Sequence, residues 1–309
     1  MYQEGLVSVI IPTYKRADKL LRAINSVCQQ TYENLQILVV NDNEKNDEFS
    51  KELYSLMGTI EDQRVLLIEQ EKHINGAAAR NAGIKSATGE FIAFLDDDDV
   101  WAPAKIERQL NALSKLGKEY GGVSTLFYSF LDKDVILESI PYKDGYIWED
   151  ILYRRCDVTT CSVLLRHSAL DDAGYFDESL SRHQEIQLLS FFCKKYKIFL
   201  LREYLLYVDA WGENNPKPER FIKIKQDFFN AVKPLTSDMP KSHIRTMYAL
   251  HKFEVAYVYY SAHQYMDSLK YLLPLLFNLR AMYLAVERVI IRMKSKNKAR
   301  HDKLRVFWC

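Results

Sequence analysis

Four consecutive aspartates, Asp96 to Asp99, follow directly on an apolar segment at residues 89–95. A buried strand with this sequence delivers four carboxylates to one point, where they repel one another unless a cation lies among them. Mg²⁺ and Mn²⁺ prefer such hard oxygen ligands. A solvated acidic loop has the same composition. The preceding strand favours a functional site, because sites in α/β proteins lie at the carboxyl ends of strands.

A second group of polar residues follows another apolar run, residues 35–40, as Asn41-Asp42-Asn43. A carboxylate and amides at this position suit hydrogen bonding to a base or a ribose, although an Asx turn or a helix cap would use Asp42 equally well. Dinucleotide-binding and P-loop folds need glycines in the first strand–helix turn. That turn reads Pro-Thr-Tyr-Lys-Arg at 12–16, so the sequence excludes both folds.

The elements that must position these residues alternate along the first part of the chain. Strands are predicted at residues 6–11, 35–40, 64–68 and 90–95, and helices at 17–30, 48–57, 77–86 and 103–116. Such alternation predicts a mainly parallel, Rossmann-like α/β sheet flanked by helices.

The pattern changes after Gly121, and the second half of the chain is predicted in less detail. Strand-like runs lie at 123–131, 162–165 and 198–208, with a helix at 184–195 between the last two. A loop at 211–218 contains Gly, Asn-Asn and two prolines, which favour a boundary. We therefore predict a catalytic domain at 1–215 and a helical region at 216–309, with helical patterns over 243–262 and 265–293.

Composition limits the classes of function. The 309 residues are 48% hydrophobic and 27% charged, and the net charge of +1 does not indicate a nucleic-acid partner. The five cysteines form no C-x-x-C pair, which favours reduced thiols in a cytosolic protein. We expect no leader before Leu6 and no transmembrane helix, because the apolar stretch at 271–279 is far shorter than the ~20 residues that span a bilayer.

Several motifs occur together in one order, and their combination resembles family 2 glycosyltransferases of the bacterial polysaccharide type. The motifs are VSVIIPTY at 7–14, QQTY at 29–32, VVND at 39–42, ARNAGI at 79–84, GEFIAFLDDDD at 89–99, GYFDESL at 174–180 and RHQE at 182–185. The resemblance covers roughly residues 5–210. It implies the nucleotide-sugar-binding GT-A fold, followed here by the C-terminal helical region.

The resemblance implies a metal-dependent, inverting transfer of a sugar from a UDP-sugar to a hydroxyl of a glycan or lipid-linked saccharide. The setting would be polysaccharide synthesis for the cell envelope, in the cytoplasm or at the inner face of the cytoplasmic membrane. Asp42 would bind uracil, although the family usually has two aspartates and Asn41 stands at the first position. Pro12, Tyr14 and Arg16 would line the nucleotide pocket.

The same resemblance assigns Arg80 to steadying the nucleotide and identifies Asp96-x-Asp98 as the D-x-D motif. Asp98, with Asp96 beside it, would ligate Mn²⁺ or Mg²⁺, while Asp96 and Asp97 would face the ribose and the sugar. The departing nucleoside diphosphate gains negative charge, which a divalent cation neutralises.

Glu185 is the predicted catalytic base, in a His183-Gln184-Glu185 segment where the family usually has His-Gln-Asp. A carboxylate in the first turn of a helix also interacts favourably with the helix dipole, which is the ordinary alternative. Contacts with the acceptor or the sugar are predicted for His183, Gln184, Trp101 and Trp211, although surface exposure or core packing would account for each of them. Many members of the family have a metal-binding histidine after the last strand of the sheet. This chain has none there, and the resemblance implies Asp209 as the substitute third metal ligand.

The C-terminal helices have two interpretations. They are either a subdomain that shapes the acceptor pocket or a basic amphipathic surface on anionic lipid, since residues 280–305 hold nine Lys/Arg against two acidic residues. The Tyr-rich segment 253–260 suits a homodimer interface. Two rival functions are a sugar-phosphate nucleotidyltransferase, which lacks its glycine-rich turn here, and a non-catalytic nucleotide-sugar-binding scaffold on the same fold.

Overall fold

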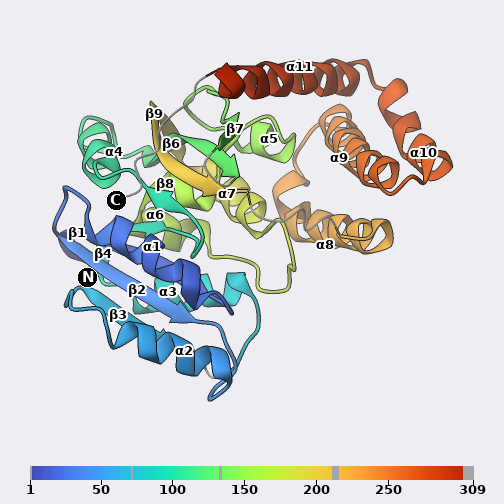
Figure 1. Ribbon diagram of the computed structural model, residues 1–309. Helices are drawn as coiled ribbons and strands as arrows, with labels where there is room; N and C mark the ends of the chain where they lie inside the picture. The colour runs from blue at the N-terminus through green and yellow to red at the C-terminus, as the bar shows by residue number, and fades with distance from the viewer. Residues whose placement is uncertain (1, 71, 132–133, 211–215, 302–309) are drawn as a thin grey trace.

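The computed structural model describes residues 2–70, 72–131, 134–210 and 216–301, and within them the chain builds one nine-stranded sheet. Its strands are β1 (Gln3–Thr13), β2 (Leu35–Asn41), β3 (Val65–Glu69), β4 (Gly89–Phe94), β5 (Val100–Trp101), β6 (Tyr120–Leu131), β7 (Asp134–Glu138), β8 (Val163–Arg166) and β9 (Lys197–Asp209). The order across the sheet is β3-β2-β1-β4-β8-β6-β9-β5, and β7 pairs with β6 (Figure 1). The predicted α/β class is confirmed.

The two halves of the sheet differ in strand direction. β3, β2, β1 and β4 are parallel, as the alternation of strand and helix predicts. β8 runs antiparallel to β4 and β6, whereas β6 and β9 are parallel to each other. The second half of the sheet is therefore mixed in strand direction.

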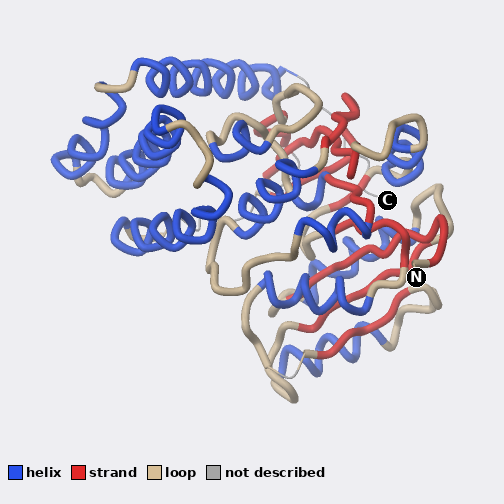
Figure 2. Tube along the Cα trace, turned by 180° about the vertical axis from the view of Figure 1, so that it is seen from behind, coloured by secondary structure: helices blue, strands red, loops and turns tan. Residues whose placement is uncertain are grey.

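Helices cover both faces of this sheet, as Figure 2 shows. They are α1 (Ala17–Cys28), α2 (Glu48–Met57), α3 (Gly76–Ser86), α4 (Lys105–Leu113), α5 (Trp148–Leu152), α6 (His167–Ala173), α7 (Gln184–Lys195), α8 (Pro218–Thr236), α9 (Lys241–Ser261), α10 (Tyr265–Leu276) and α11 (Leu279–His301). In β1, Val9 packs among residues of α1 and α4, while its neighbour Ile10 packs among residues of α3. Burial on both faces explains why these strands are continuously apolar.

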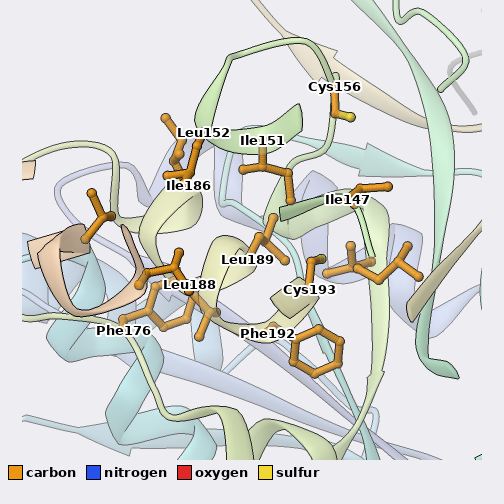
Figure 3. Packing of buried hydrophobic residues seen from close by; sticks show 14 of the residues in the cluster. Ile147, Ile151, Leu152, Cys156, Phe176, Ile186, Leu188, Leu189, Phe192 and Cys193 are labelled. Atoms are coloured by element: carbon orange, nitrogen blue, oxygen red, sulfur yellow. The ribbon is translucent and has the colours of Figure 1, made fainter. Parts of the chain in front are cut away.

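The packing of α7 fixes the position of its first turn, where Glu185 lies. Ile186, Leu189 and Cys193 of α7 are buried with Ile151 and nearby residues of the α5 region (Figure 3). The 3.6-residue period of α7 therefore sets its apolar side into the core, which holds the N-terminal end of the helix against the sheet.

The C-terminal half departs from the prediction in two places. No element is predicted between the strand-like runs at 123–131 and 162–165, yet the segment between β6 and η1 (Thr160–Ser162) contains β7 and α5. The helical pattern over 265–293 forms two helices, because Asn278 caps the second one: its Oδ1 accepts from the N–H of Ala281 at 3.0 Å.

The predicted domain boundary at 215/216 falls between β9 and α8, next to residues 211–215, which are outside the described part of the chain. It stays a prediction. One cluster of buried residues includes Ile186 of α7, Phe228 of α8, Leu250 of α9 and Leu284 of α11. The C-terminal helices thus share a hydrophobic core with the sheet, in addition to a small cluster of their own that includes Phe221 of α8 and Val255 of α9.

The approach of α3 to β1 yields a stability prediction. A Cβ atom at Gly83 would lie 2.4 Å from Cγ2 of the buried Ile10 and 3.2 Å from Cγ2 of Val40. We expect Gly83→Ala to lower the free energy of unfolding by about 1–3 kcal/mol, measured by chemical denaturation. Gly58→Ala is the control, because its nearest atoms are 3.4 Å away and its backbone is right-handed. Equal stability of the two variants would contradict this packing.

Candidate active site

A pocket of about 490 Å³ opens where β1, β2 and β4 end. The residues that line it are Pro12, Thr13, Tyr14, Arg16, Asp42, His73, Asn75, Gly76, Arg80, Asp96, Asp97 and Asp98. The predicted nucleotide-binding residues and the metal ligands Asp96 and Asp98 are thus brought together, whereas Asp209 does not line the pocket; the roles of all these residues stay predictions. Because β1 lies between β2 and β4, the strand ends before Asp42 and Asp96 are separated by two strand spacings, about 10 Å.

Asp42 lies at one end of this pocket among aromatic and amide side chains. Its carboxylate accepts from Nε2 of Gln70 at 2.9 Å and lies 3.1 Å from Nδ1 of His73. The His73 ring stacks on Tyr14, with centroids 4.1 Å apart. Burial raises the pKa of Asp42, and His73 opposes that shift. This end offers hydrogen-bonding groups beside a flat ring surface, which suits a heterocyclic base.

The four aspartates of the acidic cluster have four different environments. Asp96 pairs with Arg80, and Asp98 pairs with Arg16 at 2.5 Å. Asp97 turns inward and accepts from Oγ1 of Thr13 at 2.9 Å. Asp99 is buried away from the pocket, where it accepts from the backbone N–H of Asp209. Only the first three carboxylates line the pocket.

Burial is the main cause of the perturbed pKa values in this cluster. It raises the pKa of Asp97 to about 6, against the opposing charge of Arg16. It also raises the pKa of Asp98, to which Asp96 adds like-charge repulsion. Burial and the negative charges of Asp96 and Asp98 raise the pKa of Asp99 well above its usual range. The cluster therefore holds fewer negative charges at low pH than its composition suggests.

The carboxylates of Asp96 and Asp98 fit a hard divalent cation. Both reach the pocket, and Arg16 and Arg80 supply the positive charge that such a cation would also provide. A second set, Asp96, Asp99 and Cys161, has donor atoms within 4.8 Å of one another. Burial raises the pKa of Cys161 well above its usual range, so that thiol stays protonated and is a poor ligand. The pocket-facing pair is the better site.

Arg80 of α3 connects the acidic cluster to Glu185 of α7. Burial alone would lower the pKa of Arg80, but the charges of Asp96 and Glu185 raise it. The side chain of Gln184, the first residue of α7, approaches from the same side: a Cβ at Gly76 would lie 3.7 Å from its Oε1. Glu185 therefore carries its charge within electrostatic reach of Arg80, the arginine that pairs with Asp96.

The other two residues of that segment face protein rather than the pocket. His183 adopts a left-handed backbone, and its ring packs edge-on against Phe221 and Phe228 of α8. Burial lowers the pKa of His183 to about 2, so its ring is neutral. The ring is thus packed against α8, and its predicted contact with the acceptor or the sugar stays a prediction. Gln184 is buried, and its Nε2 donates to the carbonyl of Leu180, so its contact with the acceptor stays a prediction.

The predicted aromatic contacts also need correction. Trp101 is only 2% exposed, and its Nε1 donates to the carbonyl of Cys161 at 3.1 Å, so the ring belongs to the core and not to a sugar site. Trp211 lies outside the described residues. The carboxylate of Asp209 is 3.0 Å from Nη2 of Arg22 and 3.6 Å from Nζ of Lys19, so cations occupy the suggested third metal ligand.

Four pocket residues escaped the sequence analysis: Thr13, His73, Asn75 and Gly76. A signal existed for one of them. Asn75 precedes an alanine-rich helix, and its Oδ1 accepts from the N–H groups of Ala77 and Ala78 as an N-cap. His73 has no local signal, because its role depends on the loop after β3 returning over Asp42.

The raised pKa of Asp97 predicts how stability depends on pH. Its folded-state value of about 6 exceeds the ordinary 3.8, so ionisation of Asp97 costs stability as the pH rises through this window. We expect the stability of Asp97→Asn relative to wild type to increase between pH 4 and pH 7, by on the order of 1–3 kcal/mol. Denaturant titrations at both pH values measure it. Asp18→Asn, at an exposed carboxylate, is the control. A difference that does not change with pH would contradict the assignment.

Comparison with known proteins identifies the family. Residues 8–172 match the model of "Glycosyl transferase family 2". The Escherichia coli protein WfgD, named a UDP-Glc:alpha-D-GlcNAc-diphosphoundecaprenol beta-1,3-glucosyltransferase, is 30% identical over 207 residues, which are 62% of this chain and 77% of that protein. WfaP from Escherichia coli has the same descriptive name and is 26% identical over 174 residues, 55% of this chain. This chain spans 64% of the length of WfaP.

A solved structure agrees on the fold. The mannosyltransferase PcManGT from Pyrobaculum calidifontis, in complex with GDP-Man and Mn2+, superposes with a TM-score of 0.58 at 15% identity. The match covers 93% of this chain and 80% of that one. With more than half of its residues matching the family model, the chain belongs to glycosyl transferase family 2 and is a glycosyltransferase of the GT-A fold.

Proposed function

We propose that the enzyme transfers a sugar from a UDP-sugar, with inversion at the anomeric carbon, to a hydroxyl of a glycan or lipid-linked saccharide in cell-surface polysaccharide synthesis. The observation that carries the proposal is the pocket with a base-binding end at Asp42 and Tyr14 and a carboxylate end at Asp96 and Asp98. The names of WfgD and WfaP support UDP as the nucleotide and a diphosphate-linked lipid saccharide as the acceptor class.

The residues of the chain have distinct tasks in this proposal. Asp42 and Gln70 hydrogen-bond the base, which stacks beside Tyr14 and His73. Arg16 and Arg80 exchange their carboxylate partners in part for phosphate oxygens, to which guanidinium groups bind in a bidentate manner. Mn²⁺ or Mg²⁺ held by Asp96 and Asp98 supplies positive charge to the departing diphosphate.

Glu185 completes the reaction as the base. The acceptor oxygen forms a bond to the anomeric carbon while the bond from that carbon to the phosphate oxygen breaks, and the acceptor proton passes to Glu185. The electron pair of the broken bond leaves with UDP. The buried guanidinium of Arg80 lies within electrostatic reach of both Glu185 and Asp96, so it connects the proposed base to the carboxylate end of the pocket.

Nucleotide binding gives the first test. We expect UDP with Mn²⁺ to raise the melting temperature by several degrees, because a ligand at about 100 times its Kd adds about 2.7 kcal/mol. UDP without metal, or UDP and Mn²⁺ with Asp98→Asn, gives a much smaller shift. Asp134→Asn, at an exposed carboxylate of β7, is the matched control. A larger shift with GDP, CDP or dTDP would overturn UDP as the nucleotide.

Turnover tests the base. We expect Glu185→Gln to lower kcat by about 10²–10⁴-fold while the UDP-dependent thermal shift is unchanged, because only proton transfer is lost. Glu185→Asp keeps a carboxylate on a side chain that is one bond shorter, so we expect it to retain part of kcat. Turnover of each variant is measured as UDP release with lipid-linked acceptors. Full activity of Glu185→Gln would exclude this base. A wild-type protein that binds UDP and transfers no sugar would favour the scaffold function.

A further inference from the structure

The outer face of α11 is apolar although it is exposed. Leu279 is 76% exposed and Met293 61%, and the residues between them that point the same way are also apolar. The full stripe consists of Leu279, Met282, Tyr283, Val286, Val289, Ile290 and Met293. Their spacing of three and four residues forms one continuous side of the helix. An ordinary surface helix turns such a stripe toward the core.

The inner face of α11 explains this orientation, because ion pairs hold it against the rest of the protein. Glu287 lies 3.2 Å from Arg155, Arg288 lies 2.9 Å from Glu254, and Arg292 lies 2.7 Å from Asp157. One turn further on, Ser295 exchanges hydrogen bonds with the backbone of Glu138 in β7. Rotating the helix to bury its apolar stripe would break all of these contacts, which fixes the stripe outward.

In α10, too, a polar residue faces the protein and large apolar residues are exposed. The polar Ser268 is buried and donates to the carbonyl of Ala256 at 2.8 Å. The exposed side carries Tyr265, Met266, Leu269, Leu273 and Leu276. Between the helices, Phe277 is 88% exposed, so the most exposed large apolar side chain of the described residues lies at the bend. α10 and α11 form the outer edge of the molecule, with α9 behind them (Figure 1).

We propose that this α10–α11 apolar face, the exposed residues of α10, Phe277 and the stripe of α11, rests on an anionic bilayer. Its exposed cations are Lys270, Arg280, Lys294 and Lys296, while the nearby Asp267 is paired with Lys270. A basic rim around an apolar stripe with tyrosines is the pattern of interfacial helices that bind anionic lipid. The charge complementarity favours lipid over a second copy, whose identical basic rim would repel this one.

The geometry favours lying in the interface over spanning the bilayer. No single helix among the described residues is long and apolar enough to cross a membrane. The segments Tyr265–Leu276 and Leu279–Lys296 reach the required length and hydropathy only together, and they are bent by 117°. A helix of 12 residues and one of 23 residues that meet at an exposed Phe277 match a shallow insertion in which the bend lies deepest. The inference rests on the proposed function in one respect, since a lipid-linked acceptor is present at such a surface.

Vesicle binding by the full chain tests the proposal. We expect co-sedimentation with vesicles of phosphatidylcholine containing about one third phosphatidylglycerol, and little with phosphatidylcholine alone. Replacing Phe277 and Leu279 together by Asp lowers the bound fraction on the order of tenfold, because two apolar anchors at the bend become charged. Leu66→Asp, at an exposed apolar residue of β3, is the matched control and binds as wild type. Lys294→Gln with Lys296→Gln weakens binding and its dependence on salt.

The outcomes separate this inference from the proposed function. The UDP-dependent thermal shift is measured on every variant and shows whether each one is folded. Absent vesicle binding by a wild type that binds UDP, or equal binding by the Phe277 and Leu279 variant, would overturn the membrane surface. A dimer in light scattering that this variant dissociates, without vesicle binding, would overturn it in favour of a second copy. Vesicle binding that depends on Phe277 without any nucleotide shift would support the surface while the UDP proposal fails.

Discussion

The repulsion among four adjacent carboxylates is the constraint on which the pocket depends. β4 delivers Asp96 to Asp99 to one edge of the sheet, and no arrangement leaves all of them ionised, buried and unpaired. The chain separates them by giving Asp96 to Arg80, Asp98 to Arg16 and Asp97 to Thr13. Each of these partners comes from the end of β1, from the turn that follows it or from α3. The same electrostatic balance therefore joins the acidic loop to the elements around it.

The position of Asp99 shows the cost of this arrangement. It lies inside the protein beside Cys161, and burial raises the pKa values of both groups well above their usual ranges. Strain of this kind is typical of functional sites, where stability is given up for a fixed arrangement of charged groups. The four aspartates are thus held in place by the sheet and the helices that enclose them, rather than by hydrogen bonds to one another.

The pocket was largely predictable from the sequence because its residues lie at strand ends, and strand ends in a parallel sheet share one edge. Pro12, Asp42 and Asp96 each follow an apolar run that periodicity alone identifies. Residues placed by tertiary packing were not predictable. His73 reaches Asp42 from the loop after β3, and the indole of Trp101 donates to the carbonyl of Cys161, about 60 residues away. His183 was identified from its motif alone, which does not reveal that its ring packs against α8.

The orientation of the C-terminal helices could not be predicted from the sequence for a related reason. An apolar stripe at helical spacing usually indicates a core, yet α11 docks through a narrower apolar face around Leu284 together with its arginines, and leaves its longer apolar stripe exposed. Burial raises the pKa of Glu254, but Lys225, Arg154 and Arg288 hold it well below its usual range, so a charged anchor lies beneath the helix. Hydropathy patterns report that a helix has two faces. Which face turns inward is decided by partners elsewhere in the chain, here Glu254, Arg155 and Asp157.

The shared core has a consequence for biosynthesis. The parallel strands β1 to β4 and their helices pair mostly with neighbours in the chain, so they can assemble as the polypeptide emerges from the ribosome. The helix that carries Glu185 cannot complete its packing until Phe228 of α8 and Leu250 of α9 have been made. The nascent protein would thus form the pocket at the ends of β1, β2 and β4 before the helix that carries Glu185, the proposed base, is fully packed. The proposed catalytic activity would then require the C-terminal helices to be synthesised.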